Sequence, residues 1–299
     1  MNPGYLYAFA AYLVWGLLPV YWKWLQQVPA VQVIGHRIVW SFILLLLYII
    51  ATRQWKKFHS EINRRVFIIY GIAGILLSVN WLVYVWAVNA GFIVETSLGY
   101  FINPLLSVVL GMVFLGERLR PLQWLPIGLA AAGVVYLTLA HGSLPWIALT
   151  LAFTFGFYSL VKKVAPLGSL HGLTLETGFV FLPALGYLAL IESTGRGAFG
   201  HLSLPTDGFL AGAGIITVIP LLLFASAARR IPLTMIGIMQ YIAPTLQFLI
   251  GVFLYKEPFT PARLIGFSLV WAALLIFWLE SVLVRRRELT RYRSVMLSD

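Results

Sequence analysis

Four polar side chains follow a helical spacing within the largely apolar stretch of residues 93–115. They follow one another at steps of four, three and four residues: Thr96, Tyr100, Asn103 and Ser107. This spacing places all four on one face of a helix. Hydroxyl and amide groups on a shared face can hydrogen-bond a solute, and we expect this face to line a central substrate cavity.

A second apolar stretch, residues 234–255, carries a similar face through Gln240 and Gln247. These two residues lie 140 positions after Tyr100 and Ser107, so we expect both faces to line the same cavity. The alternative is that the polar side chains hold helices together, because interhelical hydrogen bonds are common between membrane helices.

The chain repeats itself at this constant offset of 140 residues. The matched pairs include Pro104 with Pro244, Gly111 with Gly251, Glu117 with Glu257, and Pro121 with Pro261. Proline removes a backbone donor, so we expect kinks at Pro104 and Pro244. In membrane proteins, interruptions in corresponding segments of two repeats point to the binding site of a transporter.

Aromatic and amide side chains also lie near the middle of two other apolar stretches. They are Trp15 in residues 3–22, and Asn80, Trp81 and Tyr84 in residues 66–88. Tryptophan usually lies at the membrane surface, so its central position favours the wall of a cavity for an aromatic or amphiphilic substrate. Packing against lipid or between helices explains any one of these aromatic residues equally well.

Composition indicates the elements that position these residues. Hydrophobic residues make up 61% of the chain and charged residues 10%, whereas soluble domains have about 25% charged residues. Apolar runs of about 20 residues recur, as a membrane-crossing helix requires, and they are too long for barrel strands. We predict an all-α membrane protein with these spans: 3–22, 31–52, 66–88, 93–115, 122–140, 145–163, 171–192, 208–228, 234–255 and 262–284.

The distribution of Lys and Arg sets the expected orientation. Sixteen of them lie on one side of the predicted membrane and five on the other. The positive-inside rule then places both termini in the cytoplasm. It also accounts for the net charge of +11, and no basic region of globular size is present to bind nucleic acid.

The odd number of spans in each repeat has a structural consequence. With five spans per repeat, the second repeat must cross the membrane in the opposite sense to the first. We expect ten transmembrane helices in two inverted five-helix repeats, 3–140 and 145–284, followed by a basic cytoplasmic tail, 285–299. Inverted repeats provide two nearly equivalent conformations, one open to each side of the membrane.

Three ionisable residues lie near the expected outer ends of their spans: His36, Arg37 and Glu95. Charged groups in the membrane are costly and usually functional. Arg37 and Glu95 could form an ion pair at an outer vestibule, and His36 or Glu95 could carry a proton. The alternative for Glu95 is an interaction with the dipole at the start of its helix. Glu117 and Glu257 are expected to cap tight turns between helices.

The sequence resembles the RarD branch of the EamA family, in the drug/metabolite transporter superfamily. The resemblance rests on the run SLGYFINPL from Ser97 to Leu105, the run WGLLPVY from Trp15 to Tyr21, and the Glu117-Arg-Leu119 loop. It extends over residues 1–285. It implies a transporter of the bacterial inner membrane that exports small metabolites or drug-like compounds.

A secondary transporter has two alternatives among membrane proteins, an intramembrane enzyme and a passive channel. An intramembrane enzyme needs convergent catalytic groups at depth, but the chain has two aspartates, neither at membrane depth, and no cysteine or zinc-binding motif. No nucleotide-binding loop is present, and we expect no cofactor or metal. A passive channel or facilitator stays open as the alternative, because a repeat describes the fold and not the mechanism.

The expected partners are a small-molecule substrate and the lipid bilayer. Gly208 and Gly212 are four residues apart in the predicted span 208–228. This spacing permits close helix packing, either within the chain or in a homodimer.

Overall fold

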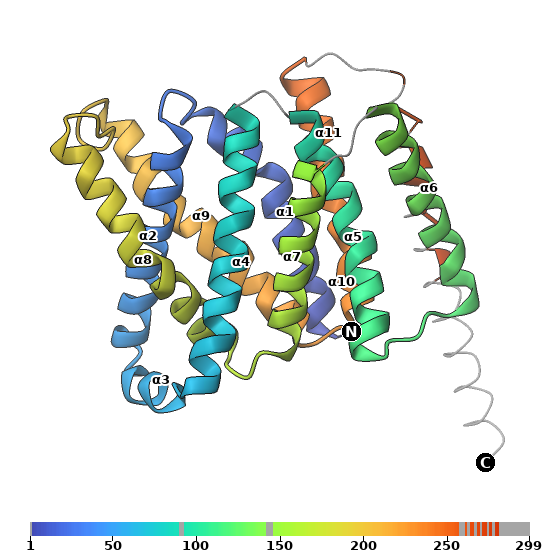
Figure 1. Ribbon diagram of the computed structural model, residues 1–299, viewed down its shortest axis with the longest axis horizontal. Coiled ribbons are helices and arrows are strands. Elements are labelled where there is room, and N and C mark those ends of the chain that lie inside the picture. The colour runs from blue at the N-terminus through green and yellow to red at the C-terminus, as the bar shows by residue number, and fades with distance from the viewer. Residues whose placement is uncertain are drawn as a thin grey trace, which may run out of the picture.

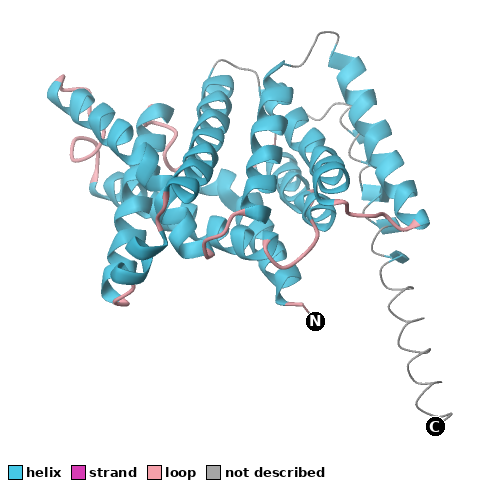
Figure 2. Cartoon of the chain, turned by 60° about the horizontal axis from the view of Figure 1, so that its bottom comes forward, coloured by secondary structure: helices cyan, strands magenta, loops and turns pink. Residues whose placement is uncertain are grey.

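The computed structural model describes residues 2–89, 93–141 and 146–256, together with a discontinuous set of residues between 261 and 280. The side chains of residues 93–98, which include Glu95 and Thr96, lie outside this description. Figure 2 shows that the described chain consists of helices joined by loops. The prediction of an all-α fold is confirmed for this part of the chain.

The described helices follow one another with short connections. In chain order they are α1 (Pro3–Lys23), α2 (Ala30–Ala51), α3 (Trp55–Glu61), α4 (Arg64–Asn89), α5 (Ile93–Leu115), α6 (Trp124–His141), α7 (Trp146–Val164), α8 (Ser169–Ser193), α9 (Leu204–Ala228), α10 (Leu233–Gln240) and α11 (Ile242–Leu249). A 3-10 turn, η1 (Pro121–Gln123), precedes α6, and a π-helical stretch, η2 (Ile250–Leu254), follows α11.

Seven stretches of the described chain are long and apolar enough to cross a membrane. Six of them are the helices α1, α2, α4, α7, α8 and α9, and the seventh runs from α10 to η2 as Leu233–Leu254. Shorter apolar helices, Gly99–Leu115 and Pro121–Tyr136, lie within α5 and at α6. Their number and length indicate a protein that crosses the membrane several times.

The structure differs from the predicted spans in two places. The short helix α3 was not predicted, and it lies beside the ends of α2 and α4 (Figure 1). The predicted span 234–255 is divided at Tyr241 into α10 and α11. Pro244 lacks the N–H that would otherwise bond to the carbonyl group of Gln240, where α10 ends. The predicted span 262–284 falls largely outside the described residues.

The helices pack in a small set of pairs. α1 packs against α9 and α11, and α2 packs against α8 and α9. α4 packs against α7 and α8, while α5 packs against α7 and α10. α6 lies at the edge of the molecule beside α5 (Figure 1). The described helices therefore form one bundle, in which α5 and α10 are in contact.

Aromatic side chains fill the space between α1, α7 and α9. Tyr12 and Trp15 of α1 contact Phe224 of α9, with ring centroids 6.3 and 5.5 Å apart. Phe155 of α7 contacts Trp15 edge-on at 5.8 Å, and Tyr158 stacks on Phe224 at 6.1 Å. Because lipid is as apolar as the side chains, such packing contacts rather than hydrophobic burial hold membrane helices together.

The carboxylate of Glu117 caps the start of α10. It accepts hydrogen bonds from the backbone N–H groups of Leu233 at 2.7 Å and Thr234 at 2.9 Å. α10 follows Pro232 and has no side-chain cap of its own, so Glu117 satisfies two donors that would otherwise lack partners. The prediction that Glu117 caps its own turn is wrong, because its partners lie 116 and 117 residues away. Glu257 lies outside the described residues.

A tight turn at the end of α5 brings Glu117 to this position. Gly116 adopts the left-handed backbone conformation with φ of +64°, which glycine tolerates without steric cost. The N–H of Glu117 then donates to the Gly111 carbonyl at 3.1 Å. A β-carbon on Gly111 would lie 2.7 Å from a carboxylate oxygen of Glu117. Both glycines are therefore needed to direct the carboxylate toward α10.

Replacing Glu117 should loosen α10. Glu117→Ala removes both hydrogen bonds and the favourable charge at the helix start, so we expect a loss of about 1–2 kcal/mol in the free energy of unfolding. Glu117→Gln keeps one acceptor and should lose less. The measurement is unfolding of the detergent-purified protein. The exposed neighbour Arg118, replaced by Ala, serves as the control, and an equal effect of Arg118→Ala would contradict the capping role.

Candidate functional site

Arg37 lies inside the membrane bundle among aromatic side chains. It is the eighth residue of α2. Its guanidinium carbon lies 4.7 Å from the ring centroid of Trp22 and 4.6 Å from that of Trp81. Its Nε donates to the Thr217 hydroxyl at 3.0 Å. Residues of α1, α2, α4 and α9 thus meet at this guanidinium group, which interacts favourably with the faces of both indole rings.

Three tyrosine hydroxyls complete the surroundings of Arg37. Tyr21, Tyr84 and Tyr100 lie close enough to interact with its charge. The rings of Tyr84 and Tyr100 are 5.7 Å apart, which joins α4 to α5. Of the predicted cavity residues, the structure therefore brings Trp81, Tyr84 and Tyr100 together, and it adds Arg37 to them. We call Arg37, Trp22, Trp81, Tyr84 and Tyr100 the arginine box.

The other two ionisable residues predicted near Arg37 are His36 and Glu95, and the ion pair of Arg37 with Glu95 stays a prediction. The adjacent residue His36 is buried and stacks on Phe199, in the loop after α8, with centroids 5.2 Å apart. The side chain of Glu95 lies outside the described residues. Among the described residues, no carboxylate is within ion-pair distance of Arg37.

Three further predicted residues lie where α5 meets α10. Asn103, Ser107 and Gln240 are buried, and each has an oxygen atom without a hydrogen-bond partner. The two helices approach closely there, because a β-carbon on Gly237 would lie 2.6 Å from the Pro104 carbonyl oxygen. We call this contact the α5–α10 seam. Buried polar atoms without partners are rare in folded proteins, so the seam holds polar groups that this conformation leaves unsatisfied.

The other predicted residues bind neighbouring helices in this conformation. Asn80 donates to the Leu151 carbonyl at 2.9 Å and to the Thr154 hydroxyl at 3.0 Å, which fastens α4 to α7. Gln247 donates to the Trp15 carbonyl at 3.1 Å, and the Trp15 ring belongs to the aromatic core. Their contacts agree with the alternative interpretation, in which polar side chains join helices.

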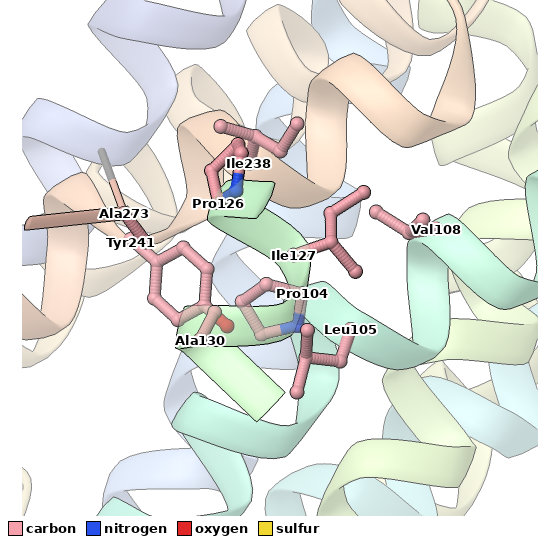
Figure 3. Close-up of a pocket in the computed structure, with 9 residues that line it drawn as sticks. All are labelled: Pro104, Leu105, Val108, Pro126, Ile127, Ala130, Ile238, Tyr241 and Ala273. Carbon is pink, nitrogen blue, oxygen red and sulfur yellow. The ribbon is translucent and has the colours of Figure 1, made fainter. Parts of the chain in front are cut away.

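The two prolines are placed differently. Pro104 lies inside the continuous helix α5, whereas Pro244 is the third residue of α11, just after the division of the span. Pro104 also lines a small apolar pocket between α5, α6 and α10 (Figure 3). The hydroxyl of Tyr241 in its wall already donates to the Phe101 carbonyl, so this pocket offers no free polar group to a solute.

A buried ion pair at the opposite end of the bundle was not predicted. Lys162 of α7 and Glu176 of α8 are 2.6 Å apart, with side chains 3% and 1% exposed. Tyr158 donates to the second carboxylate oxygen of Glu176 at 3.2 Å, and Lys162 lies over the ring of Tyr70 at 5.4 Å. The sequence contained a signal for this pair, because Glu176 lies two turns inside an apolar span that follows a lysine.

The same end is connected to α3. His171 of α8 bonds to Glu61 at 2.5 Å and to Gln54 at 3.2 Å. Arg229 also donates to the carbonyl group of Leu167 in the loop before α8. No group of three metal-binding side chains occurs among the described residues.

Comparison with known proteins identifies the family. Residues 2–139 match the model of the EamA-like transporter family. The chain is 46% identical over 291 residues to an uncharacterized transporter of Bacillus subtilis, YojE, covering 95% of this chain and 96% of the relative. It is 43% identical over 292 residues to protein RarD of Streptomyces exfoliatus, covering 97% and 93%. The chain is a RarD-type member of the EamA family. The resemblance inferred from the sequence is therefore confirmed.

The fold of this EamA chain is shared with a solved structure. A crystal structure of a protein with 20% sequence identity superposes with a TM-score of 0.69, covering 96% of this chain and 99% of the other. The family and its relatives are described as transporters, and the helices of this chain are apolar and long enough to cross a membrane. The EamA chain is thus a multi-pass membrane transporter.

Breaking the buried ion pair should destabilise the protein strongly. Glu176→Gln leaves the charge of Lys162 buried without a counter-charge, at a cost of about 3–5 kcal/mol in the free energy of unfolding. The double variant Lys162→Met with Glu176→Gln should lose less than Glu176→Gln alone, because the unpaired charge is gone. Additive losses in unfolding measurements would contradict a coupled pair. The exposed pair His201–Glu192 provides the control, since Glu192→Gln should leave stability nearly unchanged.

Proposed function

We propose that the chain is a secondary transporter that exports small organic solutes across the bacterial inner membrane. In this proposal, residues 3–140 and 145–284 form two inverted five-helix halves, and transport proceeds by alternating access between them. The basic tail 285–299 and both termini face the cytoplasm, as the distribution of Lys and Arg favours.

One pair of equivalent contacts carries this proposal. Gly16 of α1 faces Leu246 of α11, and a β-carbon on Gly16 would lie 2.7 Å from the Leu246 Cβ. Gly156 of α7 faces Leu106 of α5, and its β-carbon would lie 2.8 Å from the Leu106 Cδ2. Gly156 and Leu246 each follow their counterpart by 140 residues. The same close contact therefore occurs twice. In one copy the glycine comes from the first half and the leucine from the second, and in the other copy the roles are reversed.

The pairs of helices in contact support the same equivalence between the two halves. Under the offset, α1, α2 and α4 correspond to α7, α8 and α9, and α5 corresponds to α10 and α11. The contacts α1–α9 and α4–α7 then become equivalent, as do α2–α9 and α4–α8. The contacts α2–α8 and α5–α10 each map onto themselves. A pseudo-two-fold arrangement of this kind allows two conformations of similar energy.

The α5–α10 seam is the place where we expect the halves to part. Phe101 and Tyr241 are equivalent residues, and their rings contact each other across the seam at 6.3 Å. The unpartnered oxygens of Asn103, Ser107 and Gln240 disfavour the closed seam, since each lacks the hydrogen bond that water would give. An opened seam would return water or a solute to them.

Two alternatives are less well supported. A passive channel would not need two equivalent closed states. An intramembrane enzyme finds little support in relatives named as transporters.

The two glycines of α9 differ in their surroundings. Gly212 is approached by the Tyr21 hydroxyl within the chain, whereas Gly208 has no atom within 4 Å of a β-carbon placed there. This leaves Gly208 open to a second copy of the chain in a homodimer.

Counterflow in proteoliposomes separates a carrier from a channel. Ligands are first identified by thermal-shift screening of metabolites and drug-like compounds against the purified protein. Vesicles loaded with unlabelled ligand should then accumulate labelled ligand transiently, because a carrier exchanges one molecule for the other. Equal initial uptake with and without internal ligand would contradict alternating access and favour a channel. Protein-free vesicles are the control.

Cysteine labelling tests whether the seam opens. The chain contains no cysteine, so Asn103→Cys and Ser107→Cys introduce single reporters. We expect each to react with a water-soluble maleimide during exchange with ligand, because the open seam admits water. Val109→Cys, on the exposed face of α5 away from the seam, should stay unreacted, because lipid covers that face. Protection of both seam positions in every condition would exclude the proposed opening.

A further inference from the structure

We propose that Arg37 is the residue that anchors the substrate, and that it binds an oxyanion, most simply a carboxylate, on a small molecule with an apolar or aromatic body. This inference rests on the proposed transport function for its biological role. It rests on the arginine box alone for the binding chemistry.

The hydrogen-bonding capacity of Arg37 is largely unused. A guanidinium group has five N–H donors, and only the Nε donor is bonded to a described residue, the Thr217 hydroxyl. The two terminal nitrogens, Nη1 and Nη2, are not completely buried. Their donors are thus available to a ligand.

Among the residues that the structure describes, no carboxylate compensates the charge of Arg37. Arg37 lies two turns inside the apolar helix α2, and a charged residue within a membrane helix is costly and is usually paired. The described residues within reach are aromatic rings and hydroxyls, which do not neutralise the charge. Lys162, a buried cation, has its own carboxylate. An anionic ligand would supply to Arg37 what Glu176 supplies to Lys162.

The shape of the arginine box selects the ligand geometry. Trp22 and Trp81 lie face-on to the guanidinium group, and the Nε side is occupied by Thr217. The edge that carries the two terminal nitrogens is the part left free, and a planar carboxylate binds such an edge through two parallel hydrogen bonds. The indole and phenol rings around it provide surfaces for an apolar body.

The length of the polar face on α5 also fits a small molecule. Tyr100 belongs to the arginine box, and Asn103 and Ser107 continue along the same face toward the seam. Seven residues of helix span about 10 Å. A ligand anchored at Arg37 would therefore direct its other end to the unpartnered oxygens of the seam, which accept hydrogen bonds from hydroxyl or amine groups when the seam opens.

The test uses matched pairs of acid and amide that differ in charge but little in shape. Phenylacetate is compared with phenylacetamide, and indole-3-acetate with indole-3-acetamide, by calorimetry on the full-length protein in detergent. Wild-type protein should bind the acids better. Arg37→Gln should weaken acid binding about 10- to 100-fold, because a charge-assisted hydrogen bond is lost, and should leave amide binding nearly unchanged.

Further variants distinguish anchoring from a structural role. Arg37→Lys keeps the charge without the paired donors and should restore part of the preference for acids. Arg196→Gln removes an exposed arginine and should leave the preference intact, which excludes a general effect of net charge. Each variant is first compared with wild type by thermal unfolding. If Arg37→Gln unfolds the protein, Arg37→Lys alone must change the ratio of acid to amide affinity.

Several outcomes would overturn the assignment. One is a wild-type protein that binds acids no better than amides, and another is a folded Arg37→Gln variant that keeps the preference. Counterflow of neutral compounds alone would leave the transporter proposal standing while excluding the anion site. Conversely, Arg37-dependent binding of acids without counterflow would support the site and contradict transport.

Discussion

The contact between the Glu117 carboxylate and the first N–H groups of α10 fixes the relation between the two halves of the chain. It joins the end of α5 to the start of α10, and so sets how these helices run past each other. Leu233 and Thr234 are buried, so the free N–H groups of this helix start cannot be satisfied by water. The cap therefore determines where α10 can begin, and with it the position of Gly237 against Pro104 and of every side chain in the seam.

This constraint explains why polar atoms are left without partners at the seam. Once α10 is held at its start and Gly237 lies against Pro104, little room is left around Asn103, Ser107 and Gln240 for water. Their unsatisfied oxygens disfavour this arrangement, while the cap and the close packing favour it. In the proposed alternating-access cycle, a balance of this kind would allow the protein to leave the conformation repeatedly, because neither state can be strongly preferred if both are to be populated.

Much of the fold followed from the sequence, but the site did so only in part. Apolar runs predicted the helices, since lipid leaves the backbone few alternatives. The spacing of Tyr100, Asn103 and Ser107 placed them on one face. Spacing could not show that Asn80 bonds to α7 instead of a solute, because partners 71 and 74 residues away depend on tertiary packing. For the same reason, the contacts of Arg37 with Trp22 and Trp81 could not be foreseen.

The start of the first proposed repeat (α1 and α2) and the start of the second (α7 and α8) have equivalent positions in the fold but carry different side chains. His36 and Arg37 near the start of α2 correspond to Glu176 and Thr177 near the start of α8, and Trp22 corresponds to Lys162. At the α7–α8 end the chain forms a complete ion pair. At the α1–α2 end it presents a guanidinium group held by aromatic rings. If a ligand oxyanion pairs with Arg37, the α1–α2 end closes only when substrate is bound. The α7–α8 end closes without substrate, because Glu176 already pairs with Lys162. Such an asymmetry would couple conformational change to occupancy, because the ligand would bind the closed form of that end more tightly than the open form.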